Sequence, residues 1–205
     1  MDIYEIEEKL RKKQNRHRFS HTKGVQYTAI CLAMRYGQDL TKASYAGLLH
    51  DCAKHMSNEK LLEKCLKHNL PVSEAEKKNP FLLHGKTGAW LAEHKYGISD
   101  PEILNAVIWH TTGHPGMTML EKIVFTADYI EPGRDHAPNL PELRQLAFID
   151  LDQAVCRILE QTLDYLKSKG GEIDPTTEET YQYYLNITEQ GGNHEPVKGN
   201  DEINA

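Results

Sequence analysis

The chain has 205 residues, of which 39% are hydrophobic and 26% are charged, with a formal net charge of −6 at pH 7. This length suits one domain with a sizeable core, and the composition is that of a folded globular protein. Proteins that bind nucleic acid or acidic membranes usually carry a basic footprint, so the acidic balance argues against both partners.

The cysteine pattern indicates a reducing compartment, and the first residues of the chain do not resemble a secretion signal. Cys31, Cys52, Cys65 and Cys156 form no C-x-x-C pair and no dense framework, which argues against a disulfide scaffold. The first residues lack the basic and apolar regions of a signal peptide, and no apolar run approaches the ~18 residues of a membrane span. We therefore expect a cytoplasmic protein.

Apolar residues recur at helical spacing through the first half of the chain. Ile3, Ile6 and Leu10 predict an opening helix, and a second amphipathic pattern runs over residues 25–36. A short, almost entirely apolar helix is expected over residues 41–51, ending in His50 and Asp51. Further helices are expected after Ser57 and over residues 83–96.

The second half also favours helices. Ser99 and Glu102 have the spacing of a capping box, and the helix that they open places His110 on its apolar face. Residues 123–126 alone would fit a strand, but continuity with Asp128 favours a helix. Helices are also expected over 151–168 and 176–189. The expected fold is all-α: a single helical bundle over residues 1–189, followed by a disordered tail over 190–205.

Several predicted helices carry metal-type ligands on faces that are otherwise apolar. A buried polar group without a partner costs roughly 1 to 3 kcal/mol, and a buried charge costs more, so a bound cation explains such a cluster better than isolated core histidines do. A mixed His and Asp set suits Fe, Mn, Co or Zn. These residues are His21, His50, Asp51, His84, His110 and Asp128.

The order His, His-Asp, Asp resembles the HD-domain superfamily, which implies an HD-domain bundle with a metal site in its core. More specific segments resemble the bacterial HD-domain symmetrical bis(5'-nucleosyl)-tetraphosphatases, which hydrolyse diadenosine tetraphosphate to two ADP. The resemblance spans residues 1 to about 189. It rests on Arg18–His21, His50–Lys54, His84–Gly85, His110–Gly113 and Ala127–Arg134.

The resemblance implies roles for individual residues. His21, His50, Asp51 and Asp128 would hold a first metal ion, with iron expected first. Asp51, His84 and His110 would complete a second metal site, or the two histidines would contact substrate phosphate. Substrate-binding candidates are Arg18, Lys54, His84, His110, Thr111, His114 and Arg134, and the catalytic candidates are Asp51, Lys54, His84, His110 and Arg134. A homodimer is expected from the family alone.

The expected reaction is attack of a metal-bound hydroxide on a central phosphoanhydride, with Lys54 and Arg134 neutralising phosphate charge. Residues 173–176 resemble part of the family's C-terminal pattern, which implies a segment bordering the nucleoside pocket, but a plain turn after Gly171 fits them equally well. The alternatives are another HD enzyme, namely a nucleotide phosphodiesterase, a nucleotidase or a di-iron oxygenase, and a non-catalytic metal-binding regulatory module.

Overall fold

The computed structural model describes residues 1–170 and 173–191, and all regular structure within them is helical, which confirms the all-α expectation. The short elements α5, η1 and α9 were not expected. The elements in order are α1 (Ile3–Lys13), α2 (Arg16–Arg35), α3 (Leu40–Leu49), α4 (Asn58–Lys67), α5 (Glu74–Lys78), the 3-10 helix η1 (Pro80–Leu83), α6 (His84–Tyr96), α7 (Pro101–Trp109), α8 (Met119–Ile130), α9 (Leu140–Leu146), α10 (Leu151–Ser168) and α11 (Pro175–Gly191).

Local sequence fixes where most helices begin. Thr118 starts α8 in a full capping box, in which its hydroxyl accepts from the backbone of Glu121 while the Glu121 carboxylate accepts from the backbone of Thr118. The predicted box at Ser99 is wrong, because Asp100 caps α7 by accepting from the backbone N–H of Glu102. Aspartate is as effective a cap as serine, and Pro101 then occupies the first helical position.

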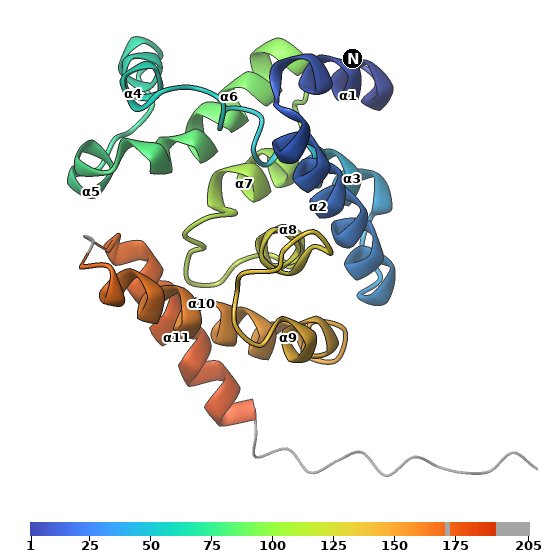
Figure 1. Ribbon diagram of the computed structural model, residues 1–205, viewed down its shortest axis with the longest axis vertical. Helices are drawn as coiled ribbons and strands as arrows, with labels where there is room; N and C mark the ends of the chain where they lie inside the picture. Colours follow the sequence, from blue (N-terminus) through green and yellow to red (C-terminus); the bar gives the residue numbers. More distant parts are fainter. Residues whose placement is uncertain (171–172, 192–205) are drawn as a thin grey trace, which may run out of the picture.

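Helix α8 is the central element of the fold. It packs against α2, α3, α7, α9 and α10 (Figure 1). Residues 123–127 are all buried, which explains why this stretch has a continuous apolar run that also resembles a strand. Contacts on several sides of α8 bury most of this helix, and the helical interpretation of residues 123–126 is confirmed.

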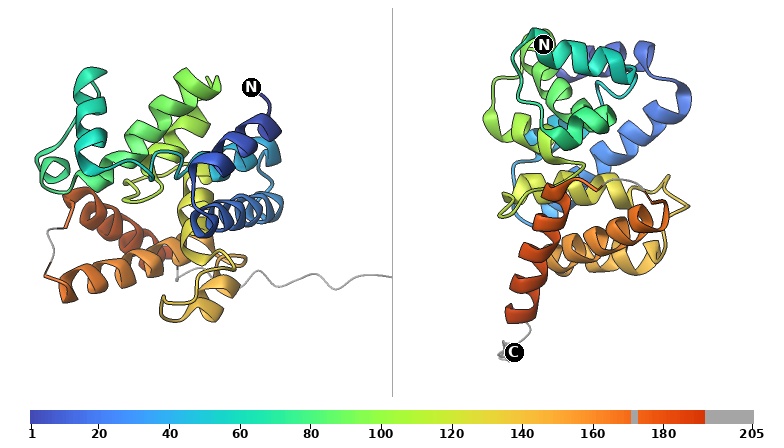
Figure 2. Two further views of the ribbon diagram at one scale, coloured as in Figure 1. Left: turned by 45° about the horizontal axis from the view of Figure 1, so that its top comes forward. Right: turned by 90° about the vertical axis from the view of Figure 1, so that its left-hand side faces the viewer.

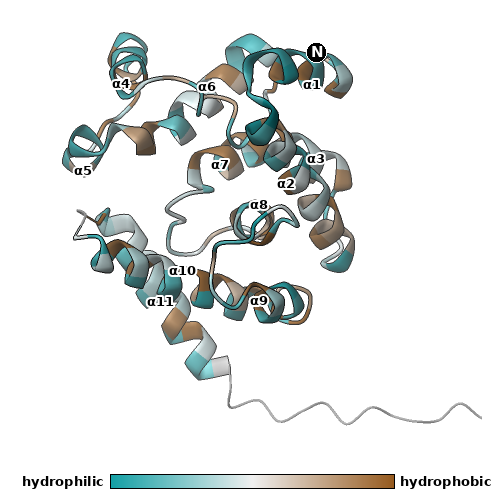
Figure 3. Cartoon of the chain, viewed as in Figure 1, coloured by the Kyte–Doolittle hydropathy of each residue, from teal (hydrophilic) through white to brown (hydrophobic). Residues whose placement is uncertain are grey.

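The remaining helices form two groups around α8. Helices α1–α7 lie on one side of it, while α9–α11 lie on the other and reach the rest of the molecule largely through α8 (Figures 1 and 2). Central α7 is largely apolar, whereas the peripheral α4 and α5 are mostly hydrophilic (Figure 3). Among the described residues no helix has the length and apolarity needed to cross a membrane.

The predicted division into a domain over 1–189 and a tail over 190–205 stays a prediction, since residues 192–205 lie outside the described residues. Helix α11 runs to Gly191, slightly beyond the predicted end. Of the two interpretations left open for residues 173–176, a local turn is present, because the Asp174 carboxylate accepts from the backbone N–H of Thr176 at the start of α11, and Asp174 also lines a cavity.

Candidate metal centre

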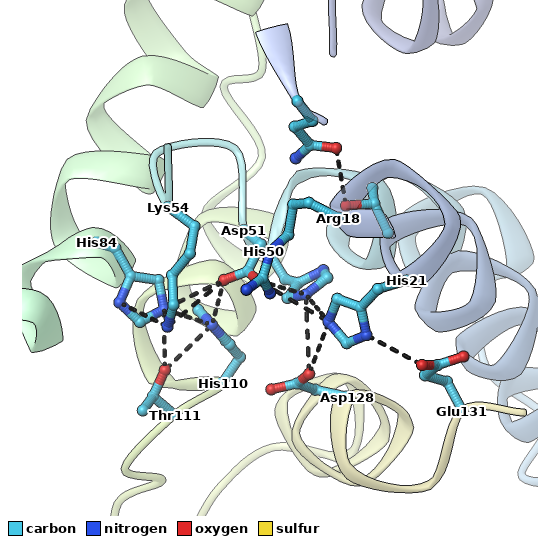
Figure 4. Close-up of polar contacts among 12 residues, drawn as sticks. Arg18, His21, His50, Asp51, Lys54, His84, His110, Thr111, Asp128 and Glu131 are labelled. Atoms are coloured by element: carbon cyan, nitrogen blue, oxygen red, sulfur yellow. Dashed lines mark hydrogen bonds and ion pairs between the residues drawn. The ribbon is translucent and has the colours of Figure 1, made fainter. Parts of the chain in front are cut away.

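The predicted ligands come from separate helices and meet at one place (Figure 4). His21 projects from the first half of α2 and Asp128 from the end of α8. His50 caps the C-terminus of α3 and is followed by Asp51. The two remaining histidines also stand at helix boundaries: His84 is the first residue of α6, and His110 is the C-cap of α7.

Three of the four histidines turn the same ring nitrogen toward the backbone. A carbonyl oxygen can only accept a hydrogen bond, so each Nδ1 in these contacts carries the proton and each Nε2 is left as an acceptor. The carbonyls belong to the residue three positions earlier in the chain, within the same helical turn. The contacts are His50 to Gly47 at 2.7 Å, His84 to Phe81 at 2.5 Å and His110 to Val107 at 2.8 Å.

The Nε2 atoms face one another in pairs. His21 Nε2 lies 3.3 Å from His50 Nε2, and His84 Nε2 lies 2.9 Å from His110 Nε2. Two neutral imidazoles with Nδ1 protonated have no hydrogen to place between such atoms. Converging lone pairs of this kind favour a bound cation, and neutral imidazole is a common ligand of transition metals.

Asp51 lies between the two histidine pairs and is 3% exposed. Its Oδ2 is 3.5 Å from His50 Nε2 and 3.8 Å from His21 Nε2, whereas its Oδ1 is 3.3 Å from His84 Nε2 and 3.5 Å from His110 Nε2. Oδ1 is buried without a hydrogen-bond partner. Two ligand groups therefore share one carboxylate, His21–His50–Asp51 and Asp51–His84–His110. The donor set of each group fits a divalent metal ion, and Asp51 is common to both groups.

Two further carboxylates flank His21. Asp128 Oδ1 lies 3.1 Å from His21 Nε2 and 3.9 Å from His50 Nε2, so it borders the first ligand group. Glu131, which is 3% exposed, places Oε1 3.1 Å from His21 Nδ1, while its Oε2 accepts from the backbone N–H of Gly133 at 2.6 Å. This contact gives His21 the same orientation that backbone carbonyls give the other histidines.

Cationic side chains surround the cluster. Arg18 donates to Asp51 Oδ2 at 2.6 Å, and Arg134 donates to Asp128 Oδ1 at 2.8 Å. Lys54 follows α3 in a non-helical turn, yet its Nζ lies 3.1 Å from His84 Nε2 and 4.0 Å from Asp51 Oδ1. The turn after α3 therefore brings Lys54 to the cluster without a continued helix.

Burial and charge shape the protonation of the site. Burial raises the pKa of Asp51, but the neighbouring His50, His110 and His84 outweigh it and hold that pKa well below its usual range. Burial lowers the pKa of His84 to about 4, with Lys54 acting in the same direction. Burial also lowers the pKa of Lys54. Burial also lowers the pKa of His21, but Asp128 and Glu131 outweigh this and raise it. The ionised Asp51 carboxylate and the neutral His84 imidazole are the protonation states that bind a metal ion.

The structure places the remaining candidates differently. Thr111 joins the cluster, with its hydroxyl 3.2 Å from His84 Nε2 and 3.1 Å from His110 Nε2. His114 instead lies beside Glu121, with Nε2 3.1 Å from that carboxylate, after Gly113 has ended the helical course at φ +63°. No described contact joins His114 to the ligands, so its substrate-binding role stays a prediction.

Sequence reasoning missed the position of Glu131, although the segment that contains it was singled out. The available signal was its spacing of three residues from Asp128, which puts both carboxylates on one side of the chain where α8 ends. Gly24 gives further evidence of a built contact, because a Cβ there would lie 2.2 Å from Glu131 Oε2.

Comparison with known proteins agrees with this geometry. Residues 18–133 match the family model of the HD domain. The chain is 40% identical over 169 residues to the "Bis(5'-nucleosyl)-tetraphosphatase, symmetrical" of Bacillus subtilis, covering 82% of this chain and 90% of that protein. It is 34% identical over 186 residues to the protein of the same name from Staphylococcus aureus, covering 90% and 95%.

A solved structure supports the same conclusion. The crystal structure of a predicted HD superfamily hydrolase involved in NAD metabolism from Clostridium acetobutylicum matches with a TM-score of 0.88 and 38% identity, covering 91% of this chain and 98% of that one. Fold, ligand pattern and sequence identity thus agree over most of the chain, and the protein belongs to the HD-domain family, among the relatives of the bacterial symmetrical bis(5'-nucleosyl)-tetraphosphatases.

Proposed function

We propose that this protein is a metal-dependent hydrolase that cleaves diadenosine tetraphosphate symmetrically into two molecules of ADP. The observation that carries the proposal is the shared Asp51, whose two oxygens face two separate pairs of histidines inside a ring of cationic side chains. The curated relatives with 34–40% identity bear the name of this activity, and they are matched over most of their length.

Each side chain has a defined task in the proposed site. His21, His50, Asp51 and Asp128 hold a first divalent ion, and Asp51, His84 and His110 hold a second. Such ions, when bound, lower the pKa of a coordinated water to about 7 in favourable sites and polarise phosphoryl oxygens. The backbone carbonyls behind the histidines and the carboxylate of Glu131 keep the Nε2 lone pairs directed at the ions.

The cationic side chains account for a polyphosphate substrate. Phosphoryl transfer needs mainly positioning and neutralisation of charge, which Arg18, Lys54 and Arg134 supply at the rim of the cluster. Arg18 and Arg134 now contact the ligand carboxylates Asp51 and Asp128, so they are already held within reach of a bound phosphate. A departing ADP ends in a phosphate whose second pKa is about 6, so it leaves without a strong general acid.

The experiment that tests the proposal is product analysis by ion-exchange chromatography after incubation of metal-loaded protein with diadenosine tetraphosphate. The expected products are two equivalents of ADP, and Asp51→Asn should form none. ATP and AMP as products would keep a hydrolase but overturn symmetric cleavage. Intact substrate in the presence of demonstrably bound metal would overturn the proposed function.

Three finer expectations belong to the same proposal. Iron is expected ahead of manganese, cobalt or zinc, a homodimer is expected, and the cytoplasm is the expected compartment. Metal analysis of protein purified without added metal, together with light scattering of the same sample, tests the first two expectations directly.

A further inference from the structure

A large cavity adjoins the metal centre. Its volume is about 1100 Å³, at the upper end of the range for small-molecule sites. Its walls come from η1, the segment after α7, the end of α8 with residues 134–139, α10 and the start of α11. Its lining residues therefore come from both groups of helices that α8 joins.

Two side chains belong both to the cavity wall and to the metal centre. Thr111 lines the cavity and contacts the Nε2 atoms of His84 and His110. Arg134 lines it as well and donates to Asp128. A ligand that fills the cavity can thus reach the cluster past a hydroxyl and a guanidinium, groups that suit a phosphate.

Beyond Arg134, the cavity wall carries an amide and aromatic rings, which belong to Gln161, Tyr129 and Tyr165. Tyr129, next to the ligand Asp128 in sequence, donates its hydroxyl to Gln161 Oε1 at 3.1 Å. Gln161 and Tyr165 lie four residues apart on α10, so their side chains are neighbours on one helix face. Tyr165 is 61% exposed although it lines the cavity, and Lys169 Nζ lies 5.6 Å from the centre of its ring, so a base would stack on the face opposite Lys169.

We infer that this cavity binds the purine nucleoside of one ADP unit of the substrate, with the base against the ring of Tyr165 and its polar edge toward the amide of Gln161. The inference rests on the proposed function and names the part of the site that sets the binding register. An aromatic face beside an amide is the combination that stacks on a base and reads its edge. The oxygen of Gln161 already accepts from Tyr129, which leaves its NH2 group to donate to a ring nitrogen or carbonyl oxygen of the base, and both purines carry such acceptors.

This placement gives a physical reason for cleavage at the centre of the substrate. With the nucleoside held on α10, its α-phosphate lies at Arg134 and its β-phosphate lies over the cluster of His and Asp ligands. The second ADP unit is then the leaving group. Tyr129 acts as a positioning residue, because its hydroxyl fixes the amide of Gln161.

The experiment compares two probes by isothermal titration calorimetry on the protein loaded with Co(II). ADP carries the nucleoside, whereas inorganic pyrophosphate carries the phosphates alone. Removing an aromatic side chain on which a base stacks should weaken ADP binding by about 5- to 150-fold in Tyr165→Ala. Gln161→Ala should weaken ADP binding too, and neither substitution should change the affinity for pyrophosphate.

Matched controls are available on other faces of the molecule. Tyr4→Ala removes an exposed tyrosine of α1, and Gln153→Ala removes an exposed glutamine of α10, both away from the cavity. Neither control should alter binding of ADP. The inference is overturned if Tyr165→Ala and Gln161→Ala bind ADP as the unaltered protein does, or if they lose pyrophosphate to the same degree.

The inference and the proposed function fail in different ways. Hydrolysis of diadenosine tetraphosphate with ADP affinity that is insensitive to both substitutions would refute the nucleoside site and leave the proposed function intact. The opposite outcome combines two observations: the unaltered protein hydrolyses no dinucleotide, and both variants bind ADP more weakly than it does. This outcome would support the nucleoside site and refute the proposed function.

Discussion

Replacing Glu131 with glutamine should weaken metal binding although Glu131 is not itself one of the proposed ligands. Its Oε1 accepts from His21 Nδ1 and its Oε2 accepts from the backbone N–H of Gly133. A glutamine has one oxygen for these two donors. If that oxygen faces His21, an amide N–H opposes the N–H of Gly133. If it faces Gly133, the amide N–H favours the tautomer of His21 in which Nε2 carries the proton and cannot bind the ion.

The expected size follows from the role of such partners. Loss of a carboxylate behind a metal-binding histidine typically reduces metal affinity by about 10- to 100-fold, or about 1.4 to 2.7 kcal/mol. We expect Glu131→Gln to fall in this range for the ion held by His21, because Glu131 is buried and solvent cannot readily replace it. The ion held by His84 and His110 should be nearly unaffected, since their Nδ1 atoms face backbone carbonyls.

The assay is titration of the metal-free protein with Co(II) in the presence of a competing chelator. Glu63→Gln, an exposed change on α4, is the matched control and should bind as the unaltered protein does. Thermal unfolding of the metal-free variants separates a local effect from a loss of fold. Equal affinity in Glu131→Gln and Glu63→Gln, at equal stability, would refute the reasoning about tautomer control.

Other changes test other parts of the structure. Asp51→Ala should abolish both metal content and turnover, because both ligand groups share this carboxylate, and full activity in a metal-free variant would contradict the site. Gly85→Ala should destabilise the protein by about 1 to 3 kcal/mol in urea unfolding, because the new Cβ would lie 2.4 Å from the carbonyl oxygen of Ile108. Thr118→Ala should cost about 1 kcal/mol of stability by removing the cap of α8, with cleavage products unchanged; an unaltered unfolding midpoint would mean that Glu121 caps the helix alone.

The positions of most longer helices follow from local sequence. Apolar periodicity together with short-range caps such as Asp39 and Thr118 acts within a few residues, so these signals are present in the chain before it folds. The short helices α5, η1 and α9 were not predicted from these signals. Helix α9, Leu140–Leu146, is too brief to establish a period, and it forms where Leu140 and Leu143 are buried by tertiary packing.

The sequence by itself determined which residue types were available to the site. His50 beside Asp51, and Asp128 on an apolar helix, were recognisable because burial of such groups needs a compensating partner. The resemblance to the HD-domain family divided these residues between two metal sites. It also identified Lys54 and Arg134 as candidates for binding phosphate. Both lie in turns, so helical spacing does not predict their positions.

Tertiary structure alone decided how these side chains are oriented and what lies beside them. Packing of α2, α3, α7 and α8 turns the two oxygens of Asp51 toward different histidine pairs and brings Glu131 behind His21. It also forms the cavity that joins Arg134 to α10. These relations join atoms far apart in sequence, and no local pattern encodes them because each depends on the distances that helix packing sets.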